Sequence, residues 1–105
     1  MPILRLETNV KLAADTLGVP ESLFAVTIYQ QQPLSFAGTF DPAFVLTVTA
    51  LGAGNPGVNK RCVQAFTKYL EETLGVSNDR GYIILTNPGS SYIGYKGDTT
   101  DVTLA

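Results

Sequence analysis

The chain contains no histidine and a single cysteine, Cys62. It therefore lacks the residues for a serine–histidine catalytic pair, for a zinc site and for an internal disulfide. Charged residues are scarce, at 15% of the 105 residues, and the formal net charge is −2 with no basic run. This charge pattern argues against binding to nucleic acid or to an anionic membrane. We expect neither a bound metal nor a cofactor.

Long apolar runs are also missing, and none approaches the length of a membrane span. The first residues include Arg5, Glu7 and Lys11, where a signal peptide would have a long apolar stretch. The cytosol is the default location, with secretion without a signal peptide as the alternative. Hydrophobic residues nevertheless make up 45% of the chain. A chain of this length forms a single domain, residues 1–105, and its apolar excess predicts burial between identical subunits.

Pro2 directly precedes an apolar strand that starts at Ile3. If Met1 is removed, Pro2 carries a free secondary amine at the start of a buried element. An α-amino group titrates near about pH 7.7–8.0, and desolvation lowers its pKa further. Such a group is a general base that requires no histidine. A proline in second position is also common where it only begins an extended segment, and a retained Met1 would make its nitrogen an amide.

Two parts of the chain repeat one pattern. Leu17-Gly18-Val19 and Leu74-Gly75-Val76 each end a predicted helix with glycine just beyond it, and a β-rich strand follows each. A strand precedes each helix as well, over 2–8 and 43–50, and the second of these alternates apolar and polar residues. The order strand–helix–strand, twice, indicates an α/β (α+β) fold.

The second helix is well defined by its sequence. Asn55 is suited to cap the helix and Pro56 to occupy its first position. Apolar residues then recur at helical spacing and predict one buried face: Val58, Cys62, Ala65, Phe66, Tyr69, Leu70 and Leu74. Cys62 on that face is interpreted as a small buried hydrophobe rather than a reactive thiol. The first helix has room for only about two turns, over 11–17, so we expect exposed sheet on its side.

The remaining segments predict loops and short strands. The segment 30–42 has no long periodic element and is interpreted as a loop with a short strand near 36–39. A turn cluster over 86–91 precedes a short strand over 92–95 and a turn over 96–98. The tail 102–104 either pairs as an edge strand or stays loose.

Several of these segments together carry a family resemblance. They appear in the family's order and cover nearly the whole chain except the missing part of the first helix: Met1-Pro2, Thr8-Asn9-Val10, Leu17-Gly18-Val19-Pro20, Ser35-Phe36-Ala37-Gly38, Asp79-Arg80-Gly81-Tyr82 and Gly94-Tyr95-Lys96-Gly97. The chain resembles the tautomerase superfamily, in the branch of macrophage migration inhibitory factor and D-dopachrome tautomerase. The resemblance implies a four-stranded mixed sheet with helices on one face, the first helix being truncated.

The resemblance also implies an activity and an assembly. Pro2 corresponds to the amino-terminal proline that shuttles a proton in keto–enol tautomerism of phenylpyruvate-like or dopachrome-like substrates. Tyr82 corresponds to a pocket tyrosine contributed by the neighbouring subunit, and Leu51 to an aliphatic residue whose backbone helps hold the substrate. Tyr95 corresponds to an aromatic residue near the pocket mouth. The implied partners are a small carboxylate or enol substrate and two further copies of the chain, in a homotrimer.

Two positions depart from the family pattern. Val19 replaces a lysine that binds the substrate carboxylate, and Ile84 replaces a pocket asparagine. A weak or altered tautomerase is expected, in which another cation could serve the carboxylate: Arg5, Lys11, Lys60 or Lys96. Two alternatives remain open, namely a non-enzymatic, cytokine-like interaction protein with a vestigial site, and a ferredoxin-like binding module built from the same two units.

Overall fold

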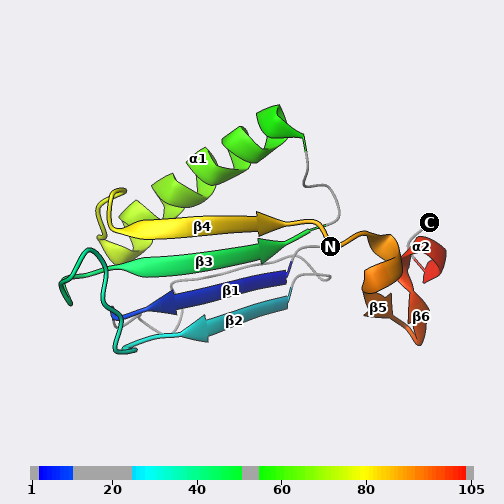
Figure 1. Cartoon of the computed structure of the whole chain (residues 1–105), viewed down its shortest axis with the longest axis horizontal. Coiled ribbons are helices and arrows are strands. Elements are labelled where there is room, and N and C mark those ends of the chain that lie inside the picture. Colours follow the sequence, from blue (N-terminus) through cyan, green and yellow to red (C-terminus); the bar gives the residue numbers. More distant parts are fainter. Residues whose placement is uncertain (1–2, 11–24, 51–54, 104–105) are drawn as a thin grey trace.

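A computed structural model of the chain describes residues 3–10, 25–50 and 55–103. Its main sheet has four strands in the order β2–β1–β3–β4, as Figure 1 shows. Their bounds are β1 (Ile3–Thr8), β2 (Ala25–Tyr29), β3 (Phe44–Thr49) and β4 (Gly81–Thr86). Strands β1 and β2 are parallel, β3 and β4 are parallel, and β1 runs antiparallel to β3. The predicted mixed sheet is confirmed.

This topology decides against the ferredoxin-like alternative. In that fold the two strands of each strand–helix–strand unit are split by another strand. Here β1 pairs directly with β2, and β3 pairs directly with β4. The ferredoxin-like hypothesis is therefore wrong, and the two units meet through the antiparallel pair β1–β3 at the centre of the sheet.

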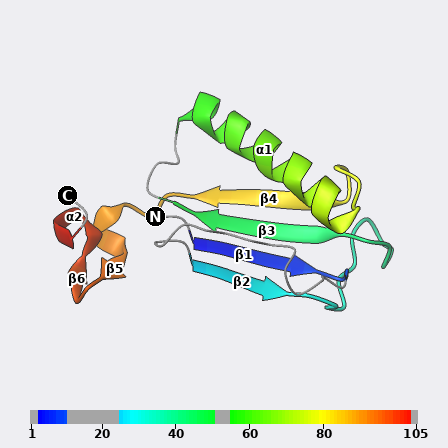
Figure 2. The same ribbon diagram turned by 180° about the vertical axis from the view of Figure 1, so that it is seen from behind.

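Helix α1 (Pro56–Leu74) begins and ends where the sequence predicts. The Asn55 side chain accepts hydrogen bonds from the backbone N–H groups of Gly57 and Val58, at 2.9 and 3.3 Å. At the other end Gly75 adopts φ 66° and its N–H donates to the carbonyl of Glu71, which closes the last turn. The helix lies behind the start of β4 in Figure 1 and in front of it in Figure 2, so it covers one face of the sheet.

The core lies between α1 and this covered face. Alternate residues of β1 and β3 point into it, as the period of two requires. Its buried members are Leu4, Leu6, Phe44, Leu46, Val48, Leu70, Leu74 and Val76. On the same face of the edge strand β2, Ile28 is still 38% exposed although its neighbour Leu6 is buried. This agrees with the expected exposed sheet on the side of the short first helix, whose residues lie outside the described ranges.

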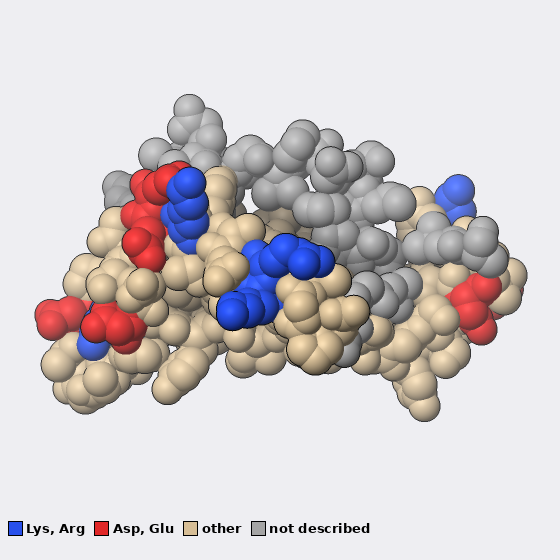
Figure 3. All heavy atoms as spheres, turned by 90° about the horizontal axis from the view of Figure 1, so that it is seen from above, with Lys and Arg blue, Asp and Glu red and all other residues tan. Residues whose placement is uncertain are grey.

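The predicted buried face of α1 is wrong for three of its seven residues. Val58, Ala65 and Tyr69 are exposed, whereas Leu70 and Leu74 are buried and Phe66 packs against the core. The reason is that α1 crosses the sheet obliquely and approaches it at its C-terminal end, as Figure 2 shows. Figure 3 looks down on this helix and shows side chains of both charge signs on the same face.

Gly81 at the start of β4 is required by a close contact. A Cβ at this position would overlap the ring of Phe44, whose side chain is almost fully buried. Phe44 and Gly81 are neighbours in the β3–β4 pairing, and the Phe44 ring occupies the space where a side chain of residue 81 would begin. The glycine thereby lets β4 begin directly against the core, one residue before Tyr82.

A small unit follows β4 and extends beyond one end of the sheet (Figure 1). It contains a 3₁₀ turn η1 (Ser90–Tyr92), the hairpin strands β5 (Gly94–Tyr95) and β6 (Asp98–Thr99), and the short helix α2 (Thr100–Thr103). The predicted turn is confirmed at Lys96 and Gly97, which both have positive φ as a two-residue hairpin turn requires. Of the predicted strand over 92–95, only 94–95 is a strand.

The prediction of an edge strand or a loose tail over 102–104 is wrong for its described residues. Thr100 is buried, its side chain donates to the carbonyl of Ser90 at 2.7 Å, and its N–H donates to the carbonyl of Ile93 at 2.9 Å. These bonds turn the chain back onto η1 and begin α2, which carries 102 and 103 into a helical turn.

Candidate functional site

The open face of the sheet, opposite α1, carries two of the predicted site residues. Tyr82 and Ile84 on β4 point to this face and are 66% and 48% exposed. Arg5 lies on the same face of β1, where its guanidinium sits 5.0 Å from the centre of the Tyr29 ring and forms an ion pair with Glu7 at 3.4 Å. Arg5, a candidate cation for the substrate carboxylate, is thus already paired with Glu7 and Tyr29 of its own chain.

Tyr82 and Ile3 lie at opposite ends of the sheet. The pairing places Tyr82 beside Val45, whereas Ile3 lies beside Thr49, which in turn lies beside Thr86. Four residue steps therefore separate the two levels, and at about 3.3 Å per residue they amount to about 13 Å along the strands. Within one chain, the tyrosine is remote from the strand start that follows Pro2.

Three predicted site residues, Pro2, Val19 and Leu51, lie outside the described residues. Their described neighbours still give useful geometry. Ile3 begins β1 at the same end of the sheet where Ala50 follows β3, and the Ala50 N–H donates to the carbonyl of Thr86 at 2.9 Å. The structure thus brings Ile3 and Ala50, the residues bonded to Pro2 and Leu51, to one end of the sheet.

Tyr95, the sixth predicted residue, is half-buried on β5 of the C-terminal unit. The Lys96 ammonium lies 5.5 Å from the centre of its ring. This unit leaves the sheet after β4, at the end where Ile3 lies and away from Tyr82 (Figure 1). The predicted residues of one chain are therefore divided between the two ends of the sheet, Tyr95 at one and Tyr82 at the other.

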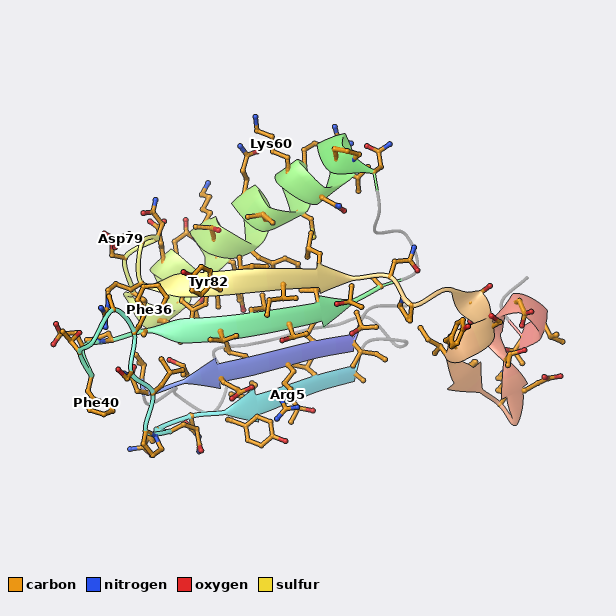
Figure 4. All side chains as sticks on the ribbon, viewed as in Figure 1. Arg5, Phe36, Phe40, Lys60, Asp79 and Tyr82 are labelled. Carbon is orange, nitrogen blue, oxygen red and sulfur yellow. The ribbon has the colours of Figure 1, made fainter. Side chains whose placement is uncertain are left out.

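Two residues without a predicted role, Phe36 and Arg80, lie near Tyr82. The rings of Phe36 and Tyr82 meet with centres 5.3 Å apart and planes inclined by 44°, in the region labelled in Figure 4. The Arg80 guanidinium lies 5.2 Å from the centre of the Phe36 ring and donates to the Phe36 carbonyl at 2.9 Å. The predicted strand near 36–39 is a tight turn closed by one bridge between Phe36 and Thr39.

Other candidates lie apart from these groups. Lys60 is exposed on α1, far from the open face (Figure 4). Cys62 is half-buried on the same helix, and burial raises the pKa of its thiol, so a smaller fraction is the nucleophilic thiolate. This setting agrees with its interpretation as a small packing residue. Among the described residues, no group of three or more Cys, Asp or Glu side chains gathers as a metal site would require.

The geometry defines a class of fold: two direct strand–helix–strand units joined by an antiparallel central pair, with Tyr82 on the open face at one end of the sheet. A model of one family, described as macrophage migration inhibitory factor, matches residues 2–101. The chain belongs to the macrophage migration inhibitory factor family.

Individual relatives agree with this assignment. The chain is 34% identical to a macrophage migration inhibitory factor homolog of Trichuris trichiura, over 94% of this chain and 99% of the relative. It is similar to the solved structure of the factor from Trichinella spiralis, with a TM-score of 0.82, 30% identity, and coverage of 92% and 98%. The factor of Oncomelania hupensis superimposes with a TM-score of 0.85 at 20% identity, which supports the fold alone.

Two further findings follow from these comparisons. The alignment to the Trichuris trichiura protein spans 113 positions, more than the 105 residues here, so that relative has residues that this chain lacks. Family membership supports, in general terms, the tautomerase and cytokine-like functions of such proteins.

Within the described ranges, no helix has both the length and the apolar character that crossing a membrane requires.

Proposed function

We propose that the chain is a cofactor-free keto–enol tautomerase of phenylpyruvate-like or dopachrome-like substrates. Pro2, freed by removal of Met1, takes a proton from one substrate carbon or oxygen and returns it to another. Leu51, Tyr82 and Tyr95 shape the pocket. The observation that carries the proposal is that Tyr82 lies about four residue steps along the sheet from the level of Ile3. A site that needs residues from both ends of the sheet must combine residues of two chains.

The proposed assembly is a homotrimer with one pocket at each interface. Its support is the apolar surface that a single chain leaves open: Tyr82, Ile84, Tyr92 and Val102 are all strongly exposed. Tyr92 and Val102 lie on the C-terminal unit, which extends beyond the sheet and can reach a neighbouring copy (Figure 1). Burial of such surface stabilises an interface by about 25 cal/mol per Å² of apolar area.

The proposed pocket is more apolar than its family pattern. Val19 stands where a lysine would bind the substrate carboxylate, and Ile84 stands where an asparagine would donate a hydrogen bond. A hydrogen bond to a charged group contributes about 1.5–3 kcal/mol, so carboxylate substrates should bind about ten- to a hundredfold more weakly. An apolar pocket also lowers the pKa of the Pro2 amine, which keeps it an unprotonated base at neutral pH.

The experiment combines an intact mass with a rate. The mass of the purified protein should lack Met1, and the protein should convert enol-phenylpyruvate to the keto form faster than buffer does. Pro2→Gly should lower the rate by about 10²-fold, the contribution of a positioned acid–base group. A full wild-type rate in protein whose mass includes Met1 would refute the Pro2 mechanism. Val19→Lys should lower the KM for phenylpyruvate; an unchanged KM would mean that another residue binds the carboxylate.

A second candidate is a cytokine-like interaction protein with a vestigial tautomerase site, acting in the cytosol or after secretion without a signal peptide. Val19 and Ile84 favour it, since both remove polar groups from the proposed pocket. The two candidates separate in the same assay. An intact, trimeric protein that has lost Met1 and still shows no rate above buffer supports the second and excludes the first.

A further inference from the structure

The loop that precedes β3 is held in a defined shape. Phe36 and Thr39 exchange two backbone hydrogen bonds, at 2.9 and 3.1 Å, around Ala37 and Gly38. Both central residues have positive φ, 51° and 80°, which is the pattern of a type I′ turn. Ala37 adopts this conformation although it carries a Cβ, which disfavours it. Contacts from outside the turn must therefore stabilise it.

Arg80 supplies such contacts from the residue before β4. Its guanidinium donates to the carbonyl of Phe36 at 2.9 Å, to that of Asp41 at 2.9 Å and to that of Pro42 at 3.3 Å. The backbone of Arg80 is fixed as well, since its N–H donates to Ser77 and its carbonyl accepts from Phe44. A planar fork with five donors can satisfy three carbonyls at once, which a lysine ammonium on a flexible stem cannot match.

Asn9 binds the other side of the same loop from the end of β1. Its amide nitrogen donates to the carbonyls of Leu34, Phe40 and Asp41, at 3.2, 3.1 and 3.0 Å, and its oxygen accepts from the N–H of Ala43 at 2.9 Å. The loop is therefore bound on two sides, by residues that are remote from it in sequence. Phe36 projects from it toward β4.

The Phe36 ring contacts both Arg80 and Tyr82. The guanidinium stacks on it at 5.2 Å, and the Tyr82 ring meets it at 5.3 Å. Tyr82 is 66% exposed, and this ring contact restricts its side chain. We propose that Arg80, acting through Phe36, fixes the orientation of the Tyr82 ring, and that both are positioning residues for it.

This inference rests on the proposed function only where enzyme activity is measured. A Tyr82 ring without the Phe36 contact would sample several rotamers, and only a few of them would meet the substrate. Phe36→Leu keeps an apolar side chain but removes the flat ring. It should raise the KM for phenylpyruvate about three- to tenfold while kcat changes less than about twofold. Arg80→Lys, which retains the charge, should act in the same direction.

The deciding experiment reads Tyr82 directly. Protein labelled with ¹³C at the tyrosine rings is compared by NMR, with the Tyr82 signal assigned by its loss in Tyr82→Phe. Phe36→Leu and Arg80→Lys should increase the motion of the Tyr82 ring, measured by ¹³C relaxation, whereas Phe40→Leu should not. Phe40 is a matched control in the same loop, with the same ring and 72% exposure. If Arg80→Lys fails to fold, Phe36→Leu alone decides.

The outcomes separate this inference from the proposed function. A Tyr82 ring that stays equally ordered in Phe36→Leu overturns the inference, whatever the activity. A more mobile Tyr82 ring in Phe36→Leu, in a protein whose wild type has no tautomerase rate, supports the positioning and refutes the proposed function. Where activity is present, Phe36→Leu should have no further effect in a Tyr82→Ala background; an equal effect there would also overturn the inference.

Discussion

Gly81→Ala tests the packing that places β4 against the core. The added methyl group would overlap the Phe44 ring, which is 1% exposed and has no free space to enter. Overpacking of this kind destabilises a core by about 1–3 kcal/mol. The backbone of Gly81 has an ordinary φ, so alanine also gains about 0.4–1 kcal/mol by restricting the unfolded chain. A net loss of about 1–2 kcal/mol is expected.

Thermal unfolding, followed by circular dichroism at equal protein concentrations, measures this loss. One kcal/mol lowers the midpoint by about 4–8 °C for a domain of this size. Gly94→Ala is the matched control, since a Cβ there makes an ordinary contact with Asp98. Combining Gly81→Ala with Phe44→Leu should lower the midpoint by less than the two changes summed, because the smaller side chain leaves room. A midpoint of Gly81→Ala at or above wild type would refute the close packing of Phe44 on β4.

Three smaller predictions concern local features. Asn55→Ala removes the acceptor of two N–H groups at the start of α1, so the free energy of unfolding should fall by about 1 kcal/mol. Asn55→Asp should stay near wild type, and equal losses in the two variants would exclude the cap. Ala37→Gly should raise the free energy of unfolding by about 0.5–1 kcal/mol, because glycine adopts positive φ without steric penalty. A lower midpoint of thermal unfolding would argue against the turn between Phe36 and Thr39. Since burial raises the pKa of Cys62, iodoacetamide at pH 8 should alkylate the folded protein more slowly than the urea-unfolded chain; equal rates would contradict this.

The sequence predicts the elements whose signals are local. Helix α1 follows from Asn55-Pro56 at its start and Gly75 at its end, and the strands follow from alternating apolar residues. The segment 100–103 could not be predicted in this way, because α2 depends on the bond of the Thr100 side chain to Ser90, ten residues earlier. The exposure of Val58 likewise depends on how far the N-terminal end of α1 stands from the sheet, which no periodic pattern records.

The candidate site also has features that the sequence predicts and features that only the structure provides. Tyr82, Ile84 and Tyr95 could be named from sequence resemblance, but their division between the two ends of the sheet required the strand register. The contact of Arg80 with Phe36 joins residues 44 positions apart, and it has no signature in either segment alone. In the sequence Phe36 is an ordinary loop residue, and its contact with Tyr82 is found only when β4 is placed beside the loop.

The central claim is that Pro2 of one chain works with Tyr82 of another. Pro2→Gly and Tyr82→Ala proteins, each assayed alone, should have little tautomerase activity. When they are unfolded together in equal amounts and refolded, random trimers should contain about one quarter of sites with both native residues. A site shared between two chains predicts recovery of about one quarter of the wild-type rate. A mixture no more active than the mean of the two variants would contradict the shared site.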